Sequence, residues 1–284
     1  MIYFPMPTEG PAAHGNAKAE VAKLARAASG GVISSADASV ALGVSRRAGA
    51  RRLAALTAAG WLTRLRRGYY LVVPLEAASG RATTVEDPWL LAAVMFEPCY
   101  IGGWSAAEHW GLTEQLFRST FVATAANIRA RSLTYLGATF KLVRVKADRV
   151  RNLTSIWRGA SRVLVSGKER TLVDGAIDPS WLGGFRHLQD VFTAFTESGD
   201  AIELLRELKH SGTGAGAKRI GYLTEQHWPE ANGLRDGAHA MRSTGVIKLD
   251  PAVRRRGSMN SRWGLWVNTS PHARRHGAGA PGTA

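Results

Sequence analysis

The chain has 284 residues, of which 45% are hydrophobic and 21% charged, and its formal net charge is +15. This composition excludes a disordered or fibrous protein, and the length allows one or two domains. Because so large a positive charge concentrates polyanions around a protein, nucleic acid is the first partner to consider.

Two further features bear on the compartment. Cys99 is the only cysteine, which excludes an intramolecular disulfide and a multi-cysteine zinc site and favours the reducing cytoplasm. The longest apolar run, residues 89–96, is far shorter than a membrane span, and residues 1–15 lack the pattern of an export signal. We therefore expect a cytoplasmic protein that does not contact a membrane.

The first part of the chain has the pattern of three helices followed by a hairpin. Residues 1–16 hold three prolines and two glycines and are predicted to form a flexible arm. Helical spacing begins at Ala17, Ser34 or Ser35 can cap a second helix to about residue 42, and Ser45 can cap a third to about residue 59. Two strands, 61–65 and 69–73, then flank a tip at 66–68. This order predicts a winged helix-turn-helix over residues 17–76.

The third helix has the two faces that a reader of the DNA major groove needs. Gly49, Leu53 and Leu56 cluster on one side, and Arg47 and Arg51 project from the opposite side, one turn apart. An arginine fork can pair with guanine or with phosphate, and further arginines at the hairpin tip suit a wing that meets phosphates. The predicted DNA-binding residues are Ser45, Arg46, Arg47, Arg51, Arg52, Arg64, Arg66 and Arg67. The alternative is an ordinary solvated helix face.

A second domain is predicted after a linker at residues 77–88. Its helices are expected at 89–96, 105–111, 169–177, 186–197, 201–210 and 217–227, and its strands at 120–124, 139–146, 162–166 and 262–268. Residues 89–270 should therefore form a mixed α/β domain, which makes the whole chain α+β, and residues 271–284 a disordered basic tail.

Several segments resemble one family of regulators. Residues 42–47, 53–62 and 66–71 resemble the N-terminal winged helix of AbiEi-family antitoxins. Residues 86–90, 100–115, 169–174, 218–225 and 262–268 are similar to the C-terminal domain of that family. The resemblance implies a transcriptional autorepressor that binds an inverted-repeat operator upstream of its own operon. It also implies an antitoxin that opposes a co-encoded nucleotidyltransferase-like toxin, with the C-terminal domain needed for neutralisation and, in some members, for DNA binding.

The second domain contains a basic stretch of its own. Residues 129–170 hold eleven Lys or Arg against two acidic residues. A second positive surface could therefore include Lys141, Arg144, Lys146, Arg149 and Arg151, with an ordinary solvated face as the alternative.

No catalytic residue, metal site or cofactor is expected. The alternative function is a winged helix fused to a metal-dependent endonuclease, because residues 207–209 match a Glu-x-Lys fragment, although their pattern is helical. Arg170 and Asp174 share a helix face, and we interpret them as an ion pair that fixes a helix, with a toxin or DNA contact as the alternative. Residues 211–219 lack the second glycine of a phosphate loop, and Trp104 and Trp110 are expected in the core.

Overall fold

The computed structural model describes residues 11–73, 87–159, 161–211 and 213–269. The chain forms two compact units, one of residues 1–102 with 117–166 and the other of residues 103–116 with 167–284. The predicted linker at 77–88 therefore does not separate the compact units, because the strands that follow it group with the N-terminal part and the later helices form a unit of their own. None of the described helices is long and apolar enough to cross a membrane.

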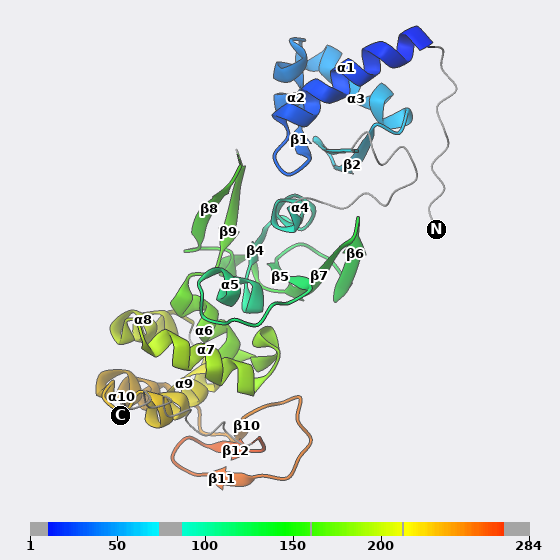
Figure 1. The fold of residues 1–284 in the computed structure, drawn as a ribbon. Helices are drawn as coiled ribbons and strands as arrows, with labels where there is room; N and C mark the ends of the chain where they lie inside the picture. The colour runs from blue at the N-terminus through cyan, green and yellow to red at the C-terminus, as the bar shows by residue number, and fades with distance from the viewer. Residues whose placement is uncertain (1–10, 74–86, 160, 212, 270–284) are drawn as a thin grey trace, which may run out of the picture. The chain divides into compact units, whose positions relative to one another are not determined.

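The N-terminal part of the first unit is the predicted winged helix (Figure 1). Its elements are α1 (Pro11–Ala27), β1 (Val32–Ser34), α2 (Ser35–Leu42), α3 (Arg46–Ala58), β2 (Leu62–Arg66) and β3 (Tyr69–Val72). The three strands form an antiparallel sheet in the order β1-β3-β2. The predicted arm was wrong for residues 11–16, which belong to α1, and Pro11 is the first residue of that helix. Residues 1–10 lie outside the described part.

Local capping and one close contact set the position of α3. The Ser34 hydroxyl caps α2 by accepting from the Asp37 N–H, and the Ser45 hydroxyl caps α3 by accepting from the Ala48 N–H at 3.3 Å. A Cβ on Gly49 would lie 2.2 Å from Ser39 Oγ of α2, so only glycine allows the two helices to pack this closely.

The rest of the first unit is a six-stranded mixed sheet with the order β6-β7-β5-β4-β9-β8. It is preceded by α4 (Pro88–Met95), which the Asp87 carboxylate caps. Its strands are β4 (Cys99–Ile101), β5 (Ser119–Thr124), β6 (Ser132–Tyr135), β7 (Ala138–Arg144), β8 (Thr154–Arg158) and β9 (Ser161–Val165). The pairs β5/β7 and β4/β9 are parallel, and the hairpins β6/β7 and β8/β9 end the sheet at its two edges.

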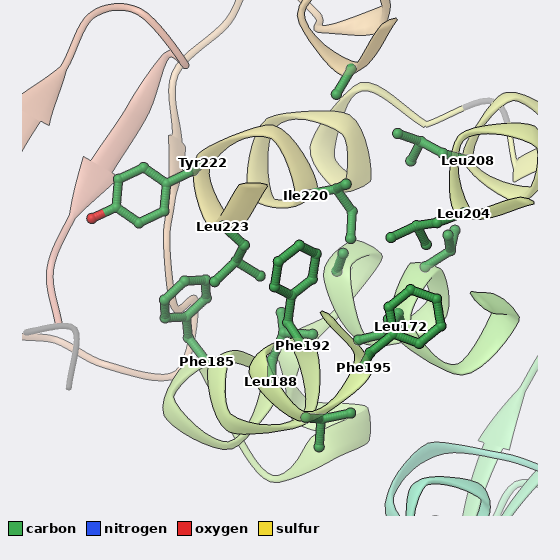
Figure 2. Packing of buried hydrophobic residues seen from close by; sticks show 14 of the residues in the cluster. Leu172, Phe185, Leu188, Phe192, Phe195, Leu204, Leu208, Ile220, Tyr222 and Leu223 are labelled. Carbon is green, nitrogen blue, oxygen red and sulfur yellow. The ribbon is translucent and has the colours of Figure 1, made fainter. Parts of the chain in front are cut away.

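The second unit is mainly helical. It contains α5 (Gly103–His109), α6 (Lys168–Ile177), η3 (Pro179–Leu182), α7 (Phe185–Thr196), α8 (Ala201–Ser211), α9 (Gly214–His227) and α10 (Asn232–Met241). Side chains of α6, α7, α8 and α9 meet in one apolar cluster in which Phe185, Phe192, Phe195 and Ile220 are fully buried (Figure 2). A small sheet, β10 (Ile247–Lys248), β12 (Leu265–Val267) and β11 (Ser258–Asn260), completes the unit.

The mixed helix and strand composition confirms the predicted fold class. The expected helices are all present, and the expected strands at 120–124, 139–146, 162–166 and 262–268 correspond to β5, β7, β9 and β12. Helix α10 and the strands β4, β6, β8, β10 and β11 were not predicted, and the predicted tail at 271–284 lies outside the described residues.

Candidate nucleic-acid interface

Helix α3 presents arginines on the face opposite its buried side. Gly49, Leu53 and Leu56 are buried, and Leu53 and Leu56 join the core of the winged helix. Arg47 and Arg51 are exposed, and no ion pair is found for either of them within the described residues. They are therefore free to contact a ligand one helical turn apart, and the exposed Arg46 lies beside them.

Two of the predicted DNA-binding arginines are engaged elsewhere. Arg52 Nη1 lies 3.0 Å from Glu20 Oε1 on α1, with about half of the arginine side chain exposed. Arg66 is ion-paired with Glu97, and its guanidinium carbon lies 4.4 Å from the centroid of the Tyr69 ring. A carboxylate therefore neutralises part of the charge of each arginine, which weakens its attraction for phosphate.

The hairpin turn is smaller than the predicted tip. Arg66 is the last residue of β2 and pairs with Tyr69, so the turn itself consists of Arg67 and Gly68, with Gly68 at φ 82°. The exposed cations of the wing are Arg64 and Arg67.

The electrostatic surroundings of this surface are one-sided. Residues 17–73 contain ten Lys or Arg and only two acidic residues, Glu20 and Asp37. Glu20 pairs with Arg52, and the Asp37 carboxylate accepts from the Ser34 hydroxyl at 2.6 Å at the start of α2. Neither α3 nor the hairpin contributes a carboxylate, so their field attracts anions.

Comparison with known families identifies this part of the chain. Residues 21–73 match the model of a family described as transcriptional regulator, AbiEi antitoxin. The N-terminal part of the chain is therefore similar to the AbiEi antitoxin regulators over the whole winged helix except the start of α1. The matched segment runs from within α1 to just past β3, so it includes every arginine of α3 and of the hairpin.

The chain also resembles a solved structure over nearly its full length. The crystal structure of the RV2827C protein from Mycobacterium tuberculosis is 20% identical in sequence, with a TM-score of 0.54 over 92% of each chain. At this identity the likeness concerns the fold alone, and it extends the shared fold well beyond the winged helix. No curated protein matches the sequence.

The predicted second basic surface does not lie on one face of its strand. Lys141 and Arg144 both belong to β7, and side chains three residues apart on a strand point to opposite faces. Lys146 directly precedes a short 3₁₀ helix, η2 (Ala147–Arg149), and Arg151 follows that helix closely. Arg144, Lys146 and Arg151 are exposed at and after the carboxyl end of β7, whereas Lys141 and Arg149 are half-buried.

Two arginines that lie over tryptophan rings, Arg158 and Arg162, were not predicted from the sequence. Trp89, the partner of Arg158, is distant in sequence, and Trp157, the partner of Arg162, lies on a strand that was not predicted. The guanidinium of Arg162 lies 4.3 Å from the ring centroid of Trp157, its cross-strand neighbour in the β8/β9 hairpin, and Trp157 is 63% exposed. Arg158 lies over Trp89, at 4.4 Å from the ring centroid. The sequence signal that could have indicated the contact of Trp157 with Arg162 is their placement on either side of a turn that contains Gly159.

The polar residues of the second unit that could suggest chemistry serve packing. Arg170 Nε donates to both carboxylate oxygens of Asp174 at 3.0 Å, which confirms the predicted pair, and Arg170 Nη1 donates to Glu207 at 3.2 Å. The contact of Arg170 with Glu207 links α6 to α8, and the Glu-x-Lys fragment lies on helix α8. Among the described residues, no group of three or more His, Cys, Asp or Glu is arranged to hold a metal ion.

The segment that superficially resembles a phosphate loop is largely helix. Most of residues 211–219 belong to a helix, because α9 already begins at Gly214. Lys218 and Arg219 are buried on α9, where Lys218 donates to the Gly245 carbonyl and Arg219 donates to four backbone carbonyls. Burial lowers the pKa of Arg219 to about 10.

Proposed function

We propose that this protein is a sequence-specific repressor of its own operon and that Arg47 and Arg51 read base edges in the major groove. The observation that carries the proposal is the pair of exposed, unpaired arginines one turn apart on α3, with no carboxylate on that helix. A planar guanidinium can donate both hydrogen bonds that guanine O6 and N7 accept, which favours one base over the others.

The wing supplies contacts of a different kind. Arg64 and Arg67 are exposed on the hairpin, and we propose that they bind phosphates, which fix the protein on DNA without reading sequence. The Ser45 hydroxyl is occupied as an acceptor in the α3 cap but keeps a proton to donate to a phosphate.

We further propose that the operator is an inverted repeat and that the protein is the antitoxin of a co-encoded nucleotidyltransferase-like toxin. Support comes from the family match of residues 21–73 and from the resemblance of later segments to the antitoxin domain. An inverted repeat would be occupied by two copies of the chain, each with its α3 in one half-site.

The test of DNA reading uses the purified chain and duplexes that carry the DNA upstream of its gene. Arg47→Ala and Arg51→Ala should each reduce discrimination between this duplex and a scrambled one by about 1 to 3 kcal/mol. Arg26→Ala, which removes an exposed arginine from α1, is the matched control and should keep the discrimination. If both α3 variants discriminate as well as the parent chain, α3 is not the reader.

The antitoxin role is tested by growth. Expression of the neighbouring toxin gene should arrest growth, and co-expression of this chain should restore it. Arg47→Ala should lose repression, measured from a promoter fusion. A toxin that arrests growth equally in the presence and absence of this chain would contradict the antitoxin assignment.

The basic residues near the end of β7 are proposed as a second DNA contact. If Arg144, Lys146 and Arg151 each bind a phosphate, replacing all three by alanine should lower the slope of log affinity against log salt by about 2.7. An unchanged slope would show that this face is an ordinary solvated one.

A further inference from the structure

The outer face of the small C-terminal sheet carries an exposed row of side chains. Trp266 of β12 is the register partner of Lys248 on β10 and of Met259 on β11, so the three side chains lie side by side on one face. Trp266 and Met259 are 38% and 47% exposed, and Lys248 is exposed as well. This face belongs to the second unit, whereas the arginines of α3 and of the hairpin belong to the first.

The opposite face of the same sheet is held firmly against the helices. Leu265 and the adjacent Trp263 are fully buried in the helical core. Arg219 of α9 donates to the carbonyls of Lys248 and Leu249, at 2.7 and 2.9 Å. The exposed row is therefore presented on a rigid support, which lowers the entropy cost of binding.

Three consecutive arginines, Arg254–Arg256, lie in the loop between β10 and β11 that Figure 1 shows beside the sheet. Asn268 Nδ2 fixes the start of this run by donating to the carbonyl of Val253 at 2.7 Å. At the other end of the run, the backbone of Gly257 packs directly against β12. A Cβ at this position would lie only 2.2 Å from the carbonyl oxygen of Val267. The arginines are thus held alongside β12 at both ends.

The charges of this region are available to a ligand. Arg254–Arg256 and Lys248 are exposed, and none of them has an ion pair within the described residues. Asp250, the one acidic residue between 242 and 268, is buried, and its carboxylate accepts from the N–H groups of Phe185 and Ala252. The surface therefore combines four free cations with one exposed indole.

We propose that this surface, formed by Lys248, Arg254–Arg256, Met259 and Trp266, binds a single-stranded nucleic acid. The four cations contact phosphates, and the Trp266 indole stacks on an unpaired base. Aromatic side chains on an open sheet face, flanked by cations, are the arrangement that binds single strands in other proteins. A duplex cannot use the indole, because its bases are already stacked.

Other occupants fit the surface less well. A second copy of the chain would bring two sets of four cations together, which like-charge repulsion disfavours. An acidic protein segment would satisfy the arginines, but the negative face of the indole does not attract a carboxylate. A single strand of RNA or DNA supplies both the phosphates and the bases.

The experiment measures fluorescence anisotropy of labelled single-stranded RNA and DNA oligonucleotides of mixed sequence with the full chain. If four phosphates are bound, affinity should fall about 50-fold between 50 and 200 mM salt, and about threefold for R254A/R255A/R256A, where one cation is left. The control R186A/R206A/K209A removes three exposed cations from α7 and α8 and should keep the parent's salt dependence. The RNA and DNA arms decide which strand is preferred.

Trp266 provides an independent measurement. Trp266→Ala should weaken binding about 5- to 150-fold with an unchanged salt slope, and Trp266→Phe, which keeps a stacking ring, should retain most of the affinity. The double variant R47A/R51A should bind single strands as the parent does, so a failed operator experiment leaves this test intact.

Three results would overturn the proposal. These are a parent chain that does not bind single strands, a control triple variant that loses as much affinity as R254A/R255A/R256A, and Trp266→Ala with parental affinity. If the arginine-loop variant instead loses binding only to the co-encoded protein, the surface docks an acidic protein and the nucleic-acid assignment is wrong.

Discussion

Substitution of Gly49 by alanine tests whether close packing of α2 and α3 positions the DNA-reading helix. The added Cβ would lie 2.2 Å from Ser39 Oγ, and Ser39 is 4% exposed with its hydroxyl bound to the Ser35 carbonyl at 2.9 Å. Overpacking of this kind costs about 1 to 3 kcal/mol, and the better helix propensity of alanine offsets about 0.5 to 1 kcal/mol. We expect Gly49→Ala to lower the stability of the winged helix by about 1 to 2 kcal/mol.

Ser39→Ala is the matched partner of this substitution. It removes Oγ, the atom nearest to the added Cβ, and leaves the Ser39 Cβ at 3.1 Å. The cost of Gly49→Ala should therefore fall in the Ser39→Ala background, with a coupling free energy of about 1 kcal/mol.

Hydrogen exchange of the α2 and α3 amides in the full chain measures this local stability, because exchange reports opening of individual regions. Operator affinity provides the second measurement, since a displaced α3 no longer holds Arg47 and Arg51 in register with the bases. Two results would refute the close-packing argument. One is that the stability effects of Gly49→Ala and Ser39→Ala simply add in the double variant, and the other is that the amides exchange no faster in either single variant than in the parent chain.

Three further predictions concern single side chains. Asp174→Ala should cost about 1 to 3 kcal/mol in urea unfolding, because Arg170, 5% exposed, loses the carboxylate that accepts from its Nε and keeps the contact with Glu207. Burial and the nearby Glu97 raise the pKa of the Cys99 thiol to about 12, so native protein should resist iodoacetamide at pH 8 and react after unfolding. The neutral buried thiol contributes stability below pH 9 that is lost between pH 9 and about 12, and Cys99→Ala should lack this part of the pH dependence. Glu97→Gln should free Arg66, raise affinity for non-operator duplexes and steepen the salt slope by about 0.9.

Each of these predictions has its own control. Replacing Arg170 and Asp174 together by apolar residues should cost less than Asp174→Ala alone, and an equal cost would contradict the explanation by a buried guanidinium that has lost its carboxylate. Rapid alkylation of Cys99 in the native state would show that the thiol is accessible. Glu230→Gln removes an exposed carboxylate from the second unit, and an equal gain in DNA affinity there would mean that Arg66 was not released.

The elements of the winged helix could be predicted from sequence because their signals are local. Ser34 and Ser45 cap the helices that follow them, and the glycines at 43, 60 and 68 adopt the positive φ that ends a helix or turns a hairpin. The alternation of buried Leu53 and Leu56 with exposed Arg47 and Arg51 follows from 3.6 residues per turn, and it needs no knowledge of the remaining fold.

Tertiary structure decided the features that depend on distant partners. Strands β6 and β8 are edge strands with few buried residues, so neither shows a clear hydrophobic pattern, and each exists through its pairing with β7 or β9. The engagement of Arg52 by Glu20 and of Arg66 by Glu97 divides a run of similar arginines into free and paired ones. The sequence by itself determined which helix presents cations, because helix periodicity is local. Only the folded chain decided which of those cations are free, because an ion pair forms between residues that the backbone brings together.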